Sequence, residues 1–321
     1  MTSVEDQAVG VVQITVGAEA VGTRLDRFLA QRLERSRRRI RELLAAGSVR
    51  LDGRNVGLAD KGLEVAEGGL IEVSEAAIQA ADHVLPQPEQ SLRVLAEGEG
   101  WLAIDKSPGT AVHPLRGGET GTVLNAVVAR HPEIQGVGEG GLRSGVVHRL
   151  DVDTSGALLL ATTAMRWEEL RSAFARHRVG KIYRALVHGR LDWEPGARLE
   201  VGLRVQQHRN ARVVVSEVPS DGDGDEGQKE WRATQTLTAL ETFAAGTLVE
   251  VRPETGFLHQ IRATLAHLGH PVLGDATYGS PEVAAYAPRH MLHAAAVEFG
   301  RVRAESPDPA DFAEVLERLR G

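Results

Sequence analysis

"HRLDVDTSG", residues 148–156, brings one imidazole, one guanidinium, two carboxylates and two hydroxyls together within nine residues. The apolar run before it, "GVVHRL", and the run after it, "GALLLATT", both have the composition of buried strands. Asp151 is therefore expected where one buried strand ends and another is about to begin. A buried carboxylate is costly unless it is paired, so Asp151 is either part of a structural ion pair or a functional group.

Three other interpretations of this region are weaker. A calcium loop that begins at Asp151 would need a bidentate glutamate at its twelfth position, which is Thr162. Asp151 and Asp153 could share a strand face and act as paired acids, but the TSG turn directs Asp153 outward to cap backbone amides. The histidines of "HLGH" (267–270) lack zinc spacing, because Gly269 ends the helix. We expect neither a metal nor a cofactor.

Positive charge is concentrated near the N-terminus. The chain carries a net charge of −7, yet residues 24–54 hold ten arginines and four acidic residues, a local charge of +6. A basic region on an acidic protein indicates binding to phosphate groups. We expect contacts with phosphate groups, and the candidate phosphate-binding residues are Arg24, Arg37, Arg38, Arg39 and Arg41.

The first 75 residues have the pattern of a small α/β unit. Leu25, Phe28, Leu29 and Leu33 recur at helical spacing behind Thr23, a candidate N-cap. The expected elements are a strand at 11–16, helices at 23–34 and 36–47, a strand–turn–strand at 48–56 and a strand at 68–73. Ser36 is expected to cap the second helix and Gly47 to end it.

The remaining chain is expected to form a second, larger domain. Residues 76–91 lose periodicity and carry two prolines, which predicts a linker. From residue 92 to 321 the pattern is rich in strands, with helices expected near 120–130, 166–177, 258–268 and 310–319. This mixture predicts an α+β fold with a mixed sheet. Residues 219–229, "PSDGDGDEGQK", are predicted to form a solvated loop.

The bulk composition favours a cytoplasmic protein. There is no cysteine, no signal-peptide pattern and no apolar run of the ~18 residues that a membrane span requires. We expect no membrane association and a monomer.

Beyond the opening motif, several segments resemble the RluA-type RNA pseudouridine synthases, in order and with the expected spacing over about 20–300. They are "DKSPGTAVHP" (105–114), "HRLDVDTSG" itself, "VGKIYRALVHG" (179–189), "ETGFLHQIRATLAHLGHPVLGDATYG" (254–279) and "RHMLHAAAVEF" (289–299). Residues 1–75, with a core at 20–74, resemble the S4 RNA-binding domain that many of these enzymes carry.

The resemblance implies roles for individual residues. Asp151 would be the nucleophile, and Arg262 would pair with it and hold it ionised and oriented. Tyr183 would stack on the target uracil and help the proton leave C5, while Arg149 would fill the space near the extruded base. His148 would shape the loop. The substrate would be structured RNA, ribosomal RNA more than tRNA, isomerised without a cofactor.

Two departures from the family pattern bear on this prediction. "TGFLHQIR" places Phe257 and Leu258 where the family has a basic and a hydroxyl residue, and the chain after Phe299 is short. An alternative is therefore a weakened or inactive RNA-binding ribosome assembly factor on the same fold. A glycosidase would need a second acid across the sugar bond, and the sequence supplies none.

Overall fold

The computed structural model describes residues 10–191, 193–207, 212–217 and 230–321. The predicted solvated loop at 219–229 lies outside these residues. The chain divides into two compact units at residues 85 and 86, inside the stretch predicted as a linker. The short segments 114–120 and 140–142 group with the first unit.

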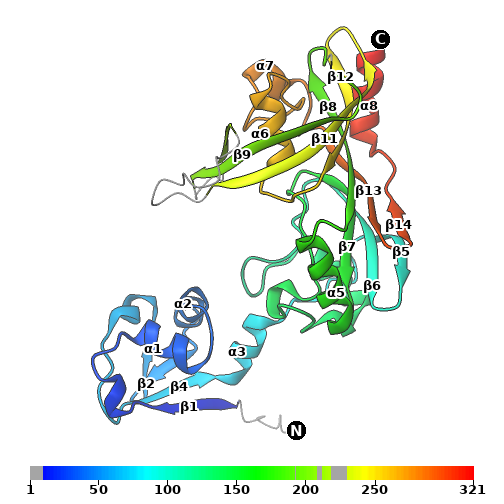
Figure 1. Cartoon of the computed structure of the whole chain (residues 1–321). Helices are drawn as coiled ribbons and strands as arrows, with labels where there is room; N and C mark the ends of the chain where they lie inside the picture. The colour runs from blue at the N-terminus through cyan, green and yellow to red at the C-terminus, as the bar shows by residue number, and fades with distance from the viewer. Residues whose placement is uncertain (1–9, 192, 208–211, 218–229) are drawn as a thin grey trace. The chain divides into compact units, whose positions relative to one another are not determined.

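The first unit combines a small sheet with helices on it (Figure 1). The described residues form an antiparallel sheet in the order β1-β4-β2-β3. Its strands are β1 (Val11–Thr15), β2 (Val49–Leu51), β3 (Arg54–Val56) and β4 (Leu70–Ser74). Helices α1 (Leu25–Arg32) and α2 (Arg37–Ala45) bury the apolar positions predicted from their spacing: Leu25, Phe28, Leu29, Ile40, Leu43 and Leu44.

The two helices begin differently. The predicted cap of α2 is confirmed, because the Ser36 hydroxyl accepts a hydrogen bond from the Arg39 amide at 3.3 Å. The prediction that Thr23 caps α1 is wrong: the N-cap is Arg24, and no side chain caps it. The Leu25 amide instead donates to the carbonyl of Leu63 at 2.7 Å, so a neighbouring segment satisfies the helix end.

The stretch predicted as a linker begins with a helix, α3 (Glu75–Asp82). The Ser74 hydroxyl accepts from the Ala77 amide at 3.3 Å and caps it. "EAAIQAAD" is rich in alanine, a strong helix former, and Ala77 and Ile78 are partly buried against the core of the first unit.

The second unit is built on one large sheet, and the mixed sheet predicted from the sequence is present. The strand order is β10-β9-β11-β12-β8-β13-β7-β6-β5, with β14 paired to β13. The β13–β7 pair is parallel, and its other neighbouring pairs are antiparallel. The strands are β5 (Arg93–Gly98), β6 (Trp101–Lys106), β7 (Ser155–Ala161), β8 (Gly180–His188), β9 (Ala197–Gln207), β10 (Arg212–Ser216), β11 (Trp231–Thr242), β12 (Gly246–Pro253), β13 (Leu292–Phe299) and β14 (Val302–Glu305).

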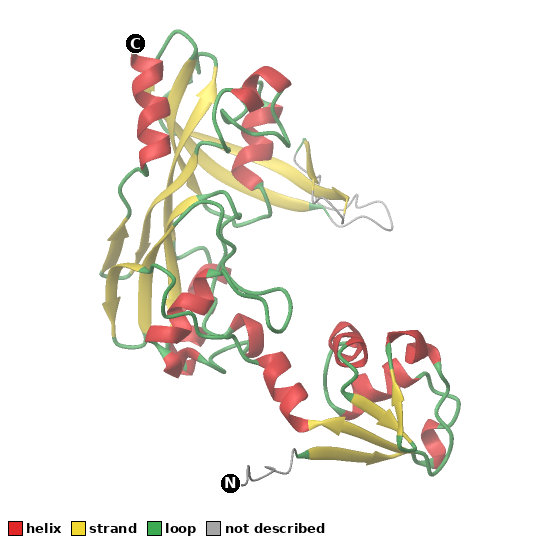
Figure 2. Cartoon of the chain, turned by 180° about the vertical axis from the view of Figure 1, so that it is seen from behind, coloured by secondary structure: helices red, strands yellow, loops and turns green. Residues whose placement is uncertain are grey.

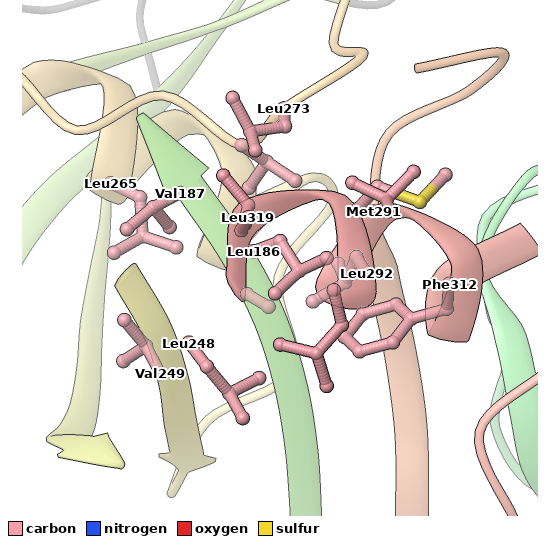
Figure 3. Close-up of a cluster of buried hydrophobic side chains, with 14 of the residues drawn as sticks. Leu186, Val187, Leu248, Val249, Leu265, Leu273, Met291, Leu292, Phe312 and Leu319 are labelled. Atoms are coloured by element: carbon pink, nitrogen blue, oxygen red, sulfur yellow. The ribbon is translucent and has the colours of Figure 1, made fainter. Parts of the chain in front are cut away.

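Helices flank this sheet at several points (Figure 2). They are α4 (Val123–Arg130), α5 (Ala164–Ala175), α6 (Gln260–His267), α7 (Pro281–Ala285) and α8 (Ala310–Arg320). Four of them match predicted helices, and α7 was not predicted. The main core lies where β8 and β12 meet α6, α8 and the start of β13, as Figure 3 shows. Leu186, Val249, Leu265, Leu292 and Phe312 are among its fully or nearly fully buried side chains.

Candidate active site

Asp151 lies in a tight turn immediately before β7. The Thr154 amide donates to the Asp151 carbonyl at 3.1 Å and closes the turn, and the Asp151 side chain keeps 24% of its surface exposed. The strand expected over "GVVHRL" is wrong, because the segment makes a single bridge, between Val146 and Leu160. β13 pairs only with Ser155 and Gly156 of β7, and the Leu159 amide farther along β7 donates to the His148 side chain instead of to a strand partner.

Buried polar groups fix this turn from beneath. The Lys106 ammonium, 1% exposed, donates to three backbone carbonyls, one of which is that of Val152 at 2.7 Å. Arg289 donates to the Asp153 carbonyl at 2.9 Å and to the Ser155 hydroxyl at 3.3 Å. Burial is the main cause that lowers the pKa of Lys106 to about 8. The turn backbone is therefore held independently of the Asp151 side chain.

The backbone conformation and the close packing at position 156 explain why this motif ends in glycine. Its φ is +115°, and a β-carbon there would overlap the backbone carbonyl of Ala294 on β13. The parallel pairing of β7 with β13 brings Ser155 opposite His293 and Gly156 opposite Ala294. A larger residue would push the two strands apart directly behind the Asp151 turn.

Arg262, on α6, joins two carboxylates. Its Nη1 donates to Asp151 Oδ2 at 3.1 Å, while Nε and Nη2 form a two-pronged contact with Asp275 at 2.7 and 2.8 Å. Asp275 is fully buried. Burial alone would raise the pKa of Asp275, but hydrogen bonds and charge from Arg262 outweigh it and lower that pKa. Asp275 thus orients the guanidinium so that its Nη1 faces Asp151.

His259 also faces Asp151. Its Nε2 lies 3.9 Å from Asp151 Oδ2, and its Nδ1 is 3.0 Å from the hydroxyl of Tyr278. The φ of His259 is +52°, a left-handed conformation that costs free energy for a residue other than glycine. The Tyr278 ring lies 5.4 Å from the Arg262 guanidinium carbon. The surroundings of Asp151 therefore come from the segment 259–278 as well as from its own turn.

The other predicted site residues differ in their surroundings. Tyr183, on β8, is partly buried, and burial followed by the negative charge of Asp151 raises the pKa of its hydroxyl. Arg149 is exposed and makes no hydrogen bond or ion pair that the structure records among the residues it describes. His148 instead accepts from the Leu159 amide at 2.9 Å and stacks on Phe174. Burial lowers its pKa to about 3, so His148 is a neutral support of β7.

Comparison with known proteins shows the family to which this chain belongs. The model of the RNA pseudouridylate synthase family matches residues 100–267, which include Asp151, Tyr183 and Arg262. The chain belongs to this family. A Pseudomonas aeruginosa protein named ribosomal large subunit pseudouridine synthase D is 33% identical over 94% of this chain and 93% of its own length. An uncharacterised RNA pseudouridine synthase of Synechocystis is 33% identical over 95% of this chain and 91% of its own.

Solved structures agree on the fold. Human RNA pseudouridylate synthase domain containing 4 covers 71% of this chain and 93% of its own, with a TM-score of 0.56 and 21% identity. The RluA-type family predicted from the motifs is thus confirmed, and the chain is an RNA pseudouridine synthase. Within the described ranges no group of His, Asp and Glu could hold a metal ion, and no helix there is long and apolar enough to cross a membrane.

The predicted RNA-binding arginines of this pseudouridine synthase do not form one uniform set. Arg24, Arg37 and Arg41 all approach the buried carboxylate of Asp26. Arg38 is largely exposed and pairs with Glu42. Arg39 is buried, with Nη1 2.8 Å from a Glu42 oxygen, so it is the least accessible of the five candidate RNA-binding arginines. Helix periodicity turns this one arginine of α2 inward.

Sequence reasoning missed several residues of the synthase site. Asp275 and Tyr278 lie within the long motif at 254–279 but were not singled out. Asp275 follows the apolar "PVLG", which is the same signal of a buried carboxylate that identified Asp151. The departures Phe257 and Leu258 pack against the apolar cluster around β9, β10 and β11. Their side chains therefore have a packing role.

A pH dependence of stability is expected from His290, whose Nε2 lies 2.9 Å from the Thr154 hydroxyl. Burial is the main cause that lowers the pKa of His290 to about 3, whereas an unfolded histidine titrates near ~6.5. Between these values the unfolded chain binds the extra proton, so the free energy of unfolding falls as the pH drops. From pH 7 to pH 5 we expect a loss on the order of 1–2 kcal/mol from this group.

Urea unfolding of the wild type and of His290→Gln at both pH values measures this effect. The variant starts from a lower stability at pH 7 but should lose less on acidification. An equal loss in both proteins would show that His290 does not contribute to the acid sensitivity.

Proposed function

We propose that this enzyme isomerises specific uridines of large-subunit ribosomal RNA and that Asp151 is its nucleophile. The observation that supports this best is the contact of Asp151 with Arg262 Nη1 at 3.1 Å, while Asp275 accepts from Nε and Nη2 of the same guanidinium. Because Arg262 is shared between two carboxylates, Asp151 is oriented without being fully neutralised. Its partly exposed side chain stays open to a substrate.

The reaction needs few protein groups. The C1′–N1 bond of uridine breaks, C1′ bonds to C5, C5 loses its proton and N1 gains one. The Asp151 carboxylate would attack the sugar or the base and carry the fragment through a covalent or glycal intermediate. Tyr183, whose raised pKa keeps its hydroxyl protonated, would stack on the uracil. After C1′ has bonded to C5, the released Asp151 carboxylate would take the C5 proton, directly or through a water that hydrogen-bonds to the Tyr183 hydroxyl. Arg149 would fill the space of the extruded base.

The substrate assignment draws on the relatives and on the first unit. Relatives from Pseudomonas aeruginosa and Xanthomonas campestris are named for the ribosomal large subunit and match over more than nine-tenths of this chain. The basic first unit would act as an S4-like module that positions structured RNA by its phosphates.

Pseudouridine mapping tests this proposal. Large-subunit ribosomal RNA and tRNA from a strain lacking the protein are each incubated with the purified enzyme and then mapped against the same RNAs from the parent strain. New pseudouridines at the sites that the deletion lost would support the proposal. Restoration only in tRNA would overturn the ribosomal assignment and leave the enzyme class intact.

The inactive assembly factor is a less favoured alternative. The departures at Phe257 and Leu258, which prompted it, pack in an apolar cluster, whereas the Asp151–Arg262 pair is complete. If the protein were an inactive assembly factor, the wild type and Asp151→Asn would restore ribosome assembly in the deletion strain equally well. Neither protein would form pseudouridine.

Charge reversal on α2 tests the RNA-binding surface. Arg37→Glu combined with Arg38→Glu should weaken binding to a large-subunit ribosomal RNA transcript by roughly 10-fold or more at low salt. The slope of log affinity against log salt should become shallower, since fewer counterions are released. Fluorescence anisotropy at several KCl concentrations gives both quantities. An unchanged slope would show that α2 presents only a solvated face.

A further inference from the structure

A buried acid lies beneath the basic surface of the first unit. Asp26, on α1, is fully buried, and its carboxylate accepts from Arg24 Nε at 3.2 Å and from Arg37 Nη2 at 2.9 Å. Arg41 Nη2 lies 3.6 Å from the same carboxylate. Burial alone would raise the pKa of Asp26, but the hydrogen bonds from Arg24 and Arg37 outweigh it and lower the pKa to about 2.

The charges in this cluster do not balance. One carboxylate faces three guanidinium groups, and the side chains of Arg24, Arg37 and Arg41 keep 48%, 51% and 44% of their surface exposed. A structural ion pair needs one arginine for one carboxylate, and an apolar side chain would fill the same position without the cost of burying a charge. The arrangement therefore leaves a fixed excess of two positive charges at the surface.

The geometry leaves donors available for a second anion. Each guanidinium has five N–H groups, and Asp26 uses at most two of any one of them. Two of the arginines come from separate elements, since Arg24 precedes α1 and Arg37 begins α2. Asp26 holds these flexible side chains together before any ligand arrives, and so reduces the entropy that they lose on binding.

We propose that Asp26 is a positioning residue that holds Arg24, Arg37 and Arg41 as a preorganised site for the phosphate backbone of RNA. This inference rests on the proposed RNA-binding role of the first unit. It differs from a general basic patch in one respect: an acidic residue is required for binding an anion. The two descriptions therefore predict opposite effects when that acid is neutralised.

Asp26→Asn and the matched control Glu34→Gln separate the two descriptions. Glu34 is an exposed acid between α1 and α2, and each substitution raises the net charge by one. Simple electrostatics predicts that both variants bind RNA at least as tightly as the wild type does. The proposal predicts that Glu34→Gln does so, whereas Asp26→Asn weakens binding roughly 5- to 10-fold because the guanidinium groups lose their common anchor.

The measurement is equilibrium binding of the full chain to a fluorescent transcript of large-subunit ribosomal RNA at fixed KCl concentration, with circular dichroism to verify folding. Tighter or unchanged binding by folded Asp26→Asn overturns the proposal. If that variant does not fold, a triple arginine-to-lysine variant at 24, 37 and 41 decides, because it keeps every charge but loses the planar donor groups. Weaker binding by this variant supports the proposal, and unchanged binding overturns it.

The reversal of Arg37 and Arg38 distinguishes this inference from the function on which it rests. If that reversal leaves RNA binding unchanged, the surface does not bind RNA and the proposed role of the first unit fails. If the reversal weakens binding while folded Asp26→Asn does not, only the positioning role of Asp26 fails.

Discussion

Asp151→Asn is expected to abolish pseudouridine formation, with a rate reduced by roughly 10⁴-fold or more, as for other enzymes that lose their nucleophile. Asparagine has the shape of aspartate, and its amide oxygen can still accept from Arg262 Nη1. The substitution removes the negative charge and the nucleophilic oxygen pair while the turn stays held by Lys106 and Arg289. Release of tritium from uridine labelled at C5, in a ribosomal RNA transcript, measures the reaction directly.

Asp153→Asn is the matched control for this experiment. Asp153 is exposed, lies two residues away and contributes its backbone carbonyl to the turn, so its side-chain substitution should leave activity within a few-fold of the wild type. Both variants should retain RNA affinity, because neither substitution removes a positive charge. Undiminished tritium release by Asp151→Asn would refute the assignment of the nucleophile, and equal losses in both variants would point to the turn rather than to one carboxylate.

Local features of the site could be predicted from the sequence because they depend on near neighbours. The position of a carboxylate between two apolar runs singled out Asp151 as a candidate, although its side chain is only partly buried. The spacing of three residues between Ser36 and Arg39 predicted the cap of α2. The helical repeat likewise predicted which side chains of α1 and α2 are buried. Each of these rests on the geometry of one turn or one helix.

The partners of Asp151 could not be predicted in the same way. Lys106 reaches the Val152 carbonyl across 46 positions of sequence, and Arg289 reaches Asp153 across 136. Such contacts depend on strand order, and the parallel pairing of β13 with β7 is invisible in either strand alone. Arg39 differs from these contacts, because its inward position follows from the helical repeat of α2, in which it lies four residues before the buried Leu43.

Arg262 contacts both the proposed nucleophile and the buried Asp275, and two substitutions separate its expected contributions to catalysis and to stability. Arg262→Lys keeps the positive charge, but a single ammonium cannot reproduce both the two-pronged contact with Asp275 and the bond to Asp151. We expect a folded protein whose kcat falls by roughly 10²–10³-fold, with a smaller change in KM, because the loss lies in orienting the nucleophile.

Arg262→Met should instead destabilise the second unit by about 3–5 kcal/mol, because it leaves the fully buried Asp275 carboxylate without its cationic partner. Adding Asp275→Asn to Arg262→Met removes the stranded charge and should restore much of that stability without restoring activity. Urea unfolding and tritium release are measured on Arg262→Met, on Asp275→Asn and on the double variant. They give the coupling energy between Arg262 and Asp275 for stability and for activity. Activity that returns together with stability would mean that Arg262 acts only by holding the fold and has no role in orienting Asp151.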